Sequence, residues 1–135
     1  MPIIVTAEEE IIVGRDVVIE GSAPNGPFAT VFEDDGDTGY FYALDTLAEE
    51  NHIQDALCIY NVDSVTDREK PSVVKIAWST DSQKAVLLIN NYPHAVFDFS
   101  ARQGFCRTGF PPPPSNGIWS NLGHQWNDAV VDLFK

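Results

Sequence analysis

The sequence predicts a mostly β domain of the α+β class, in which an antiparallel sheet of about six to eight strands, curled or doubled, is closed by one C-terminal amphipathic helix. Short apolar runs alternate with clusters of Gly, Asp, Asn and Pro along most of the chain, which is typical of strands and turns. The last segment instead repeats its apolar residues at helical spacing. At 135 residues the chain fits a single globular domain, residues 1–135. An all-β sandwich is the alternative fold.

The first half of the chain contains two candidate hairpins. Glu10–Val13 and Val17–Glu20, separated by Gly14-Arg15-Asp16, are the strands of the first. Phe28–Glu33 and Gly39–Leu44 flank an Asp-Gly pair and predict the second, because Asp-Gly accepts the positive φ of a tight hairpin turn.

The register of the second hairpin stays open at this point. If Asp-Gly forms a two-residue turn, Val31 lies opposite Tyr40 and Ala29 lies opposite Tyr42. A longer loop pairs Phe32 with Tyr40 instead. A slip of one residue moves every side chain of a strand to the other face of the sheet.

Further strands are expected in the second half. Leu57–Val62 is apolar on both faces and is typical of a central strand. Val73–Ser79 alternates as a half-buried strand does. Ala85–Ile89 and His94–Phe99 flank Asn90-Asn91 and predict another hairpin.

The C-terminal part differs from the rest of the chain in its composition and in the spacing of its apolar residues. Gln103–Asn116 contains Pro111–Pro114 and predicts an extended surface crossing, since four prolines fit neither a ladder nor a helix interior. A helix is then expected from Leu122 to Leu133, with Asn121 as its N-cap. Its apolar face would be made by Trp126, Ala129, Val130 and Leu133.

The charge is strongly acidic, with 8 Lys and Arg against 20 Asp and Glu and a net charge of −12. Nucleic acid and anionic membranes are therefore disfavoured as partners, because both are bound through clustered cations. A basic protein is the partner that such a charge attracts. The N-terminus has no basic, apolar export signal, and no run is long enough to span a membrane, so we expect a cytoplasmic protein with its two cysteines reduced.

A partner-binding site is predicted around the acidic loop. Asp34, Asp35 and Asp37 supply three carboxylates within four residues, and Tyr40 and Tyr42 follow on one face of the next strand. Trp119 is a further candidate contact, because aromatic residues are enriched at interfaces. The same carboxylates could serve a calcium-stabilised β domain, although strands rather than helices flank this loop.

The alternative hypothesis is an enzyme for a small ligand, or a hydrolase, with Cys106 as nucleophile. Arg107 would lower the pKa of the thiol, and any of the three histidines, His52, His94 and His124, could fold close as the base, with His94 as the chosen candidate. His124 and Asp128 would face each other on a helix, but two ligands are too few for a closed zinc site. No phosphate loop, nucleophile elbow or Cys-x-x-Cys pair is present, so we expect no metal and no cofactor.

Two segments of the chain are similar to segments of known proteins: VFEDDGDTGYFYALD (Val31–Asp45) and NYPHAVFDF (Asn91–Phe99). The chain resembles a family of small uncharacterised bacterial proteins, a domain of unknown function. This resemblance implies a compact bacterial domain and transfers no catalytic residue. In character the chain is also similar to acidic immunity proteins, which neutralise bacterial toxins. The sequence therefore favours a non-enzymatic protein-binding module, such as an inhibitor of a basic toxin or nuclease.

Overall fold

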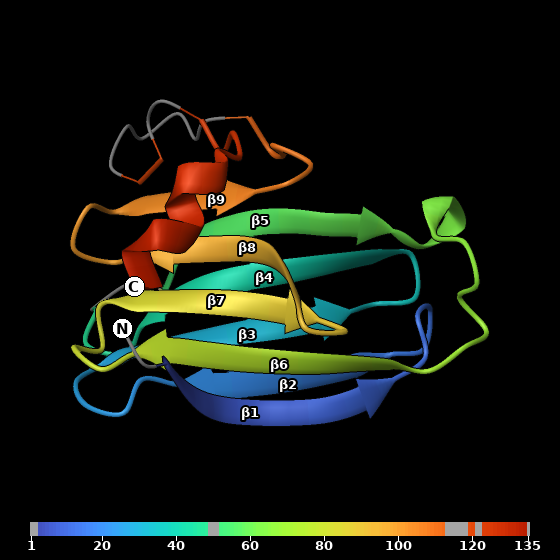
Figure 1. Cartoon of the computed structure of the whole chain (residues 1–135), viewed down its shortest axis with the longest axis horizontal. Helices are drawn as coiled ribbons and strands as arrows, with labels where there is room; N and C mark the ends of the chain where they lie inside the picture. The colour runs from blue at the N-terminus through green and yellow to red at the C-terminus, as the bar shows by residue number, and fades with distance from the viewer. Residues whose placement is uncertain (1–2, 49–51, 113–118, 121–122, 135) are drawn as a thin grey trace.

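The computed structural model describes residues 3–48, 52–112, 119–120 and 123–134. Its strands form two antiparallel sheets that face each other as a β-sandwich (Figure 1). Sheet A contains, in spatial order, β1 (Ile3–Ile11), β6 (Ser72–Ser79), β7 (Lys84–Ile89), β8 (Tyr92–Asp98) and β9 (Gln103–Cys106). Sheet B contains β2 (Val17–Ser22), β3 (Phe28–Asp34), β4 (Thr38–Asp45) and β5 (Ile53–Asn61). The predicted α+β class is therefore wrong, and the alternative, the all-β sandwich, describes the molecule.

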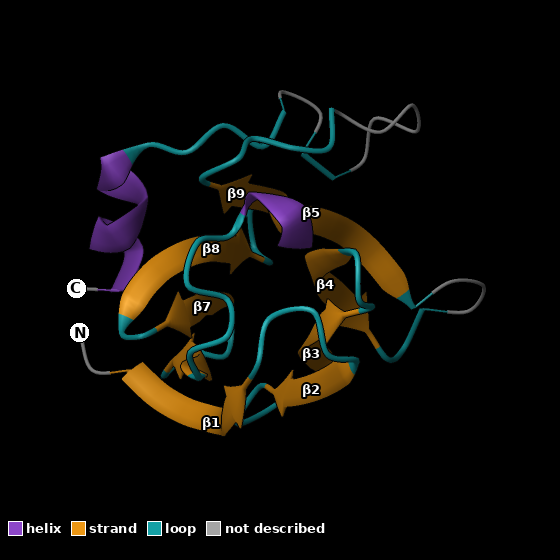
Figure 2. Cartoon of the chain, turned by 90° about the vertical axis from the view of Figure 1, so that its right-hand side faces the viewer, coloured by secondary structure: helices purple, strands orange, loops and turns teal. Residues whose placement is uncertain are grey.

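Aromatic side chains from both sheets hold the sandwich together. Phe32 and Phe41 of sheet B and Trp78 and Phe97 of sheet A are all fully buried. The rings of Phe41 and Phe97 stack across the interface with centroids 5.1 Å apart. Burying each such side chain stabilises the fold by roughly 2–3 kcal/mol. Figure 2 shows the two sheets curving toward each other, with β1 beside β2 on one side and β5 beside β9 on the other.

The hairpins at Asp-Gly and at Asn90-Asn91 are both confirmed, but the register of the Asp-Gly hairpin is wrong in both predicted forms. β3 pairs with β4 so that Glu33 lies opposite Tyr40 and Val31 lies opposite Tyr42. The turn lies further along the chain than either alternative assumes, because Asp34 is still the last residue of β3 and pairs with Gly39. In the Asn90-Asn91 hairpin, β7 pairs with β8.

The predicted pairing of Glu10–Val13 with Val17–Glu20 is wrong. β1 is longer than expected and pairs with β6, whereas β2 pairs with β3. The turn at Gly14 therefore carries the chain from one sheet to the other. Apolar periodicity identifies a strand and its buried face but carries no information about its partner.

Leu57–Val62 is not a central strand, because β5 is the last strand of sheet B. Its outer edge is covered by a short segment after β9. Cys58 N–H donates to the Phe110 carbonyl at 2.8 Å, and Thr108 Oγ1 donates to the Cys58 carbonyl at 2.6 Å. β6 is buried on both faces rather than half-buried, since Ala77 and Trp78, which point in opposite directions, both have no exposed surface.

The predicted C-terminal amphipathic helix is absent from the described residues. Asp128–Phe134 forms a short 3-10 helix, η2, and a second one, η1, follows β5 at Val62–Ser64. Val130 of η2 packs on the outer face of sheet A. The expected N-cap Asn121, and Leu122 with it, lie outside the described residues.

The segment expected to cross the surface begins as strand β9, which pairs with β8. Residues 113–116, at the end of the predicted crossing, also lie outside the residues that the structure describes. Within the described part of the chain, no helix is long and apolar enough to cross a membrane.

Candidate functional site

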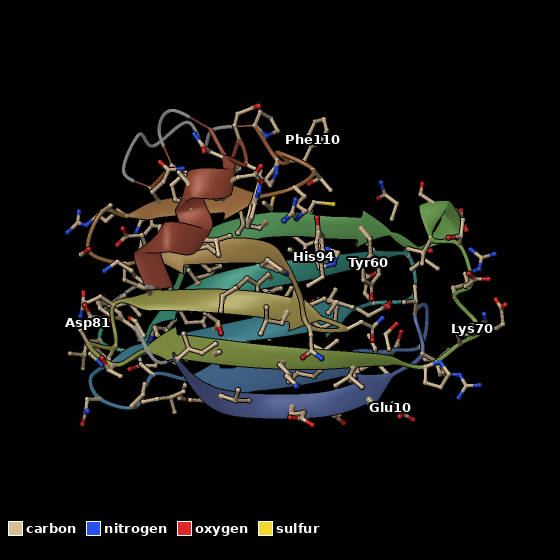
Figure 3. All side chains as sticks on the ribbon, viewed as in Figure 1. Glu10, Tyr60, Lys70, Asp81, His94 and Phe110 are labelled. Carbon is tan, nitrogen blue, oxygen red and sulfur yellow. The ribbon has the colours of Figure 1, made fainter. Side chains whose placement is uncertain are left out.

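Asp34 is buried, and its carboxylate forms hydrogen bonds that hold the loops at one end of the sandwich. Its side chain is only 1% exposed. One carboxylate oxygen accepts the Gly14 N–H at 2.8 Å and the Tyr60 hydroxyl at 2.7 Å, and the other accepts the Gly36 N–H at 2.9 Å. Tyr60 points inward from β5 (Figure 3), and burial together with the hydrogen bond to Asp34 raises its pKa. Asp34 therefore serves the fold, and its burial leaves it nothing to offer a partner.

Asp35 and Asp37 lie exposed at the tip of the β3–β4 loop. One Asp35 oxygen accepts the N–H groups of Asp37 and Thr38, each at 2.9 Å. These backbone hydrogen bonds lower the pKa of Asp35, so this carboxylate is charged at neutral pH. The Asp37 carbonyl accepts the Val62 N–H at 2.8 Å, which ties the loop to η1. The loop thus presents two carboxylates on a braced backbone.

Tyr40 and Tyr42 lie on the outer face of sheet B, half-buried and side by side. Their rings are nearly parallel, with centroids 5.9 Å apart and an interplanar angle of 22°. The Tyr42 hydroxyl donates to Glu33 Oε1 at 3.3 Å. Burial raises the pKa of both phenols, and the charge of Glu33 adds to the rise at Tyr42, so both remain neutral.

The strand registers continue this surface across sheet B. Two rows of directly paired residues run over β2, β3 and β4, and side chains that pair directly share a face. We call these six residues the acidic–aromatic face: Val18, Glu33 and Tyr40 in one row, and Glu20, Val31 and Tyr42 in the other. Val18 is 63% exposed, which is high for an apolar side chain. By contrast, η2 covers part of the outer face of sheet A.

The net charge of the protein is concentrated in the same half of the chain. Residues 16–67, which contain all of sheet B, hold 12 of the 20 Asp and Glu and none of the 8 Lys and Arg. The other residues hold 8 charges of each sign, so they are neutral in total. Sheet B and its loops are therefore the origin of the whole net charge of −12.

The other predicted partner contact, Trp119, lies in the core. It is 5% exposed, and its ring meets those of Phe97 and Phe99 edge-on at 6.2 and 5.3 Å. Its burial removes it from any contact surface in this structure.

The residues of the alternative catalytic site do not assemble into a nucleophile and its base. The Cys106 thiol is fully buried, and its polar neighbours, both at 3.4 Å, are the Thr108 hydroxyl and the Phe110 carbonyl. The guanidinium of Arg107 is sandwiched between two aromatic rings and donates to a backbone carbonyl. Burial, and then the charge of Arg107, lowers the pKa of His94.

A buried polar network that the sequence did not reveal joins Asp55, Ser120 and His124. His124 Nε2 lies 2.9 and 3.0 Å from the two Asp55 oxygens, and its Nδ1 lies 2.5 Å from the Pro111 carbonyl. The Ser120 hydroxyl also donates to Asp55, at 2.5 Å. Burial alone would lower the pKa of His124, but its hydrogen bonds to Asp55 and to Pro111, with the charge of Asp55, raise it.

Because both nitrogens of the His124 ring face acceptors, the imidazole donates from both when it is protonated, and in that form it has no lone pair for general-base chemistry. The network therefore clamps the C-terminal segment to β5. Sequence reasoning paired His124 with Asp128 on an expected helix, and that pairing is wrong. Asp128 instead accepts the indole N–H of Trp126 at 3.1 Å.

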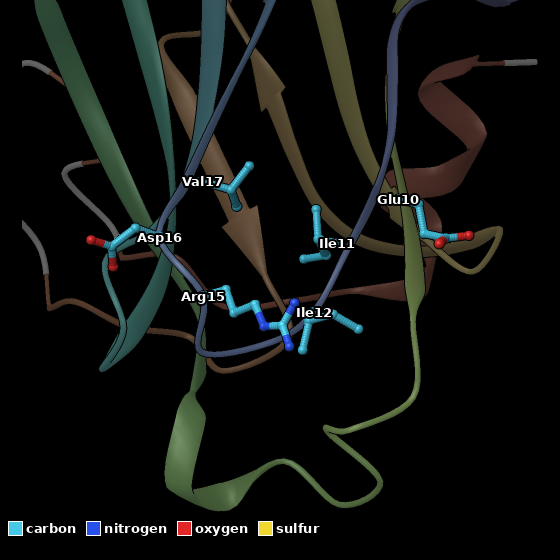
Figure 4. Close-up of a pocket in the computed structure, with 6 residues that line it drawn as sticks. All are labelled: Glu10, Ile11, Ile12, Arg15, Asp16 and Val17. Atoms are coloured by element: carbon cyan, nitrogen blue, oxygen red, sulfur yellow. The ribbon is translucent and has the colours of Figure 1, made fainter.

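Some pockets lie beside charged or polar side chains. One, of about 200 Å³, borders the Asp55–His124 pair and is lined by Ile53, Gln54, Asp55, Ala56, Pro111, Pro112 and His124. Another, of about 230 Å³, lies at the β1–β2 turn and is lined by Glu10, Ile11, Ile12, Arg15, Asp16 and Val17 (Figure 4). Its lining contains no Ser, Thr, Cys, His or Lys, and Asp16 points away from Arg15. Among the described residues, no group of three or more His, Cys, Asp or Glu side chains is placed to hold a metal ion.

Comparison with known proteins places the chain in a family. The family model described as "Uncharacterized protein conserved in bacteria (DUF2251)" matches residues 11–135. An uncharacterized protein of Haemophilus influenzae is 40% identical over 116 residues, which cover 85% of this chain and 72% of the relative. No solved structure matches the chain. The resemblance found in the sequence is confirmed: the chain belongs to the DUF2251 family of uncharacterised proteins conserved in bacteria.

Proposed function

We propose that this protein is a non-enzymatic binding module that engages a basic protein through the acidic–aromatic face of sheet B and the adjoining β3–β4 loop. The observation that carries the proposal is the segregation of charge: residues 16–67 contain 12 acidic residues and no Lys or Arg. Asp34 and Asp55 are buried, and the field of the other carboxylates steers a cationic partner toward sheet B and raises its association rate. A basic toxin or nuclease is a partner of this class.

The composition of the face supports binding beyond simple attraction. Its carboxylates, Glu20 and Glu33, alternate with apolar and aromatic side chains, which supply contact area once water is removed. Tyrosine adds a large apolar ring with a polar tip, a combination that is enriched at interfaces. Asp35 and Asp37 extend the acidic surface at the loop tip, where both side chains are exposed.

The contacts of the acidic loop also favour binding over calcium. The two Asp34 oxygens and one Asp35 oxygen accept hydrogen bonds from neighbouring groups, which is the chemistry of a tight turn. The hydrolase hypothesis gains no support from a fully buried Cys106 thiol without a histidine among its hydrogen-bond neighbours.

The test is a pull-down from the lysate of the native host with the tagged full chain, washed at low and high salt and read by mass spectrometry. We expect one stoichiometric basic protein that is released as salt rises. The variant Glu33→Gln/Asp35→Asn/Asp37→Asn should lose this protein. The change Asp35→Asn keeps a side-chain oxygen that can accept the turn hydrogen bonds, so the loop should stay folded.

The matched control is Glu8→Gln/Glu9→Gln/Glu10→Gln, which removes the same number of carboxylates from β1 of sheet A, where all three are exposed. It should retain the partner. Equal loss in both variants would show a dependence on net charge alone, and retention by the loop variant would show that the partner binds elsewhere. Either result would contradict the proposal.

A further inference from the structure

We infer that the acidic–aromatic face recognises the guanidinium group of arginine, and discriminates it from the ammonium group of lysine, in the basic partner. This inference rests on the proposed function and names the chemistry that the face selects. The selecting element is the stacked pair Tyr40 and Tyr42 together with the carboxylates of Glu33 and Asp35.

The geometry brings these four groups together on one hairpin. Tyr40 lies directly opposite Glu33, and the Tyr42 hydroxyl holds the Glu33 carboxylate at 3.3 Å. Asp35 lies in the loop that joins β3 to β4, and its charge adds to the raised pKa of Tyr40 and Tyr42, of which burial is the main cause. Two aromatic rings thus lie beside the Glu33 carboxylate on a hairpin whose turn presents a second carboxylate, Asp35.

This combination suits a guanidinium better than an ammonium ion. A guanidinium is planar and weakly hydrated, so it can stack on an aromatic ring while its N–H groups donate to a carboxylate. An ammonium ion is a compact, strongly hydrated charge, and it gains less from the rings. Carboxylates alone would attract both side chains, so the tyrosines provide the discrimination.

The protein already uses this contact elsewhere. The guanidinium of Arg107 lies between the rings of Tyr92 and Trp126, 4.4 Å from each centroid. No residue of β2–β5 could place a cation on the Tyr40–Tyr42 pair, because these strands contain no Lys or Arg. A second copy of the chain is a poor occupant, because two acidic sheet B faces repel each other.

The experiment titrates hexa-arginine and hexa-lysine into the full chain, with binding measured by calorimetry and the affected residues by NMR. The two peptides carry the same side-chain charge, so they separate guanidinium recognition from electrostatic attraction. We expect hexa-arginine to bind about tenfold more tightly, with the largest shifts at Tyr40 and Tyr42. The variant Glu33→Gln/Asp35→Asn should weaken both peptides.

The decisive variant is Tyr40→Leu/Tyr42→Leu, which keeps every charge and should abolish the preference while both peptides still bind. Its control is Tyr92→Leu, which removes a 53% exposed tyrosine of sheet A and should leave the preference intact. Equal affinity of the two peptides for the native chain, or a preference that survives Tyr40→Leu/Tyr42→Leu, overturns the inference and leaves the proposed function standing. Binding of neither peptide contradicts both.

Discussion

Replacing Asp55 by Ala should cost about 3–5 kcal/mol of stability, because it removes the acceptor at the centre of a buried network. The side chains of His124 and Asp55 are only 1% and 4% exposed. The Asp55 carboxylate accepts from the His124 ring, the Ser120 hydroxyl and the Ala56 N–H. Asp55→Asn keeps one acceptor oxygen and should cost about 1–3 kcal/mol.

The assay is urea unfolding monitored by tryptophan fluorescence. One of the 3 tryptophans, Trp119, lies in the core next to Ser120 and is expected to respond to the loss of the network. Asp37→Ala is the control: its side chain is exposed, and the change should stay within about 0.5 kcal/mol. A loss at Asp55→Ala of less than about 1 kcal/mol, the value of an exposed ion pair, would refute the reasoning. It would show that His124 is held by packing alone.

Three further predictions follow from the same structure. The folded-state pKa of His124 is raised above 6.5, so the stability that protonated His124 contributes is complete below the unfolded pKa and is lost as pH rises through the folded pKa. Chemical denaturation between pH 6 and pH 9 should show this loss in the native chain and not in His124→Gln. The same pH dependence of stability in both proteins would contradict it. Gly39→Ala should destabilise by about 1–3 kcal/mol in chemical denaturation, since its Cβ would lie 2.7 Å from the Tyr60 ring, and an unchanged midpoint would disprove this clash. The thiol of Cys106 should react slowly with iodoacetamide in the folded protein and rapidly in urea, because it is fully buried; fast labelling below neutral pH would restore the catalytic hypothesis.

The parts of the fold that the sequence predicts correctly are encoded locally. Asn90 and Asn91 both adopt positive φ in the turn between β7 and β8, as an Asn-Asn hairpin turn requires. The strand at Val73–Ser79 likewise followed from its own residues. The pairing of β1 with β6 joins residues more than 60 positions apart, and no turn specifies it.

The C-terminal segment shows why a correct pattern can give a wrong element. Trp126 and Val130 do share the apolar cluster on sheet A, as helical spacing predicts. His124, however, is held by Asp55 and by Pro111, and the Cys106 N–H donates to its carbonyl at 3.0 Å. These tertiary bonds keep the chain extended until Asp128, so only a short 3-10 helix remains.

The candidate site was predictable in part, for the same reason. Asp35, Asp37, Tyr40 and Tyr42 lie in one hairpin whose turn is readable, and the structure places all four at the surface or half-buried. The contribution of β2 was not readable, because it depends on a register that sequence leaves open. The Asp55–His124 contact joins residues 69 positions apart, and neither residue carries a local signal for the other.

The segment that covers β5 limits how a partner can use sheet B. Strand addition, in which an incoming chain extends a sheet by main-chain pairing, needs free N–H and C=O groups at an edge. At Cys58 both groups are already bonded, to Phe110 and to Thr108. A partner strand at this edge would have to displace them before pairing with Cys58. Under the proposed function, recognition beside β5 is thereby directed to side chains on the face, where single substitutions in either protein can change specificity without altering the fold.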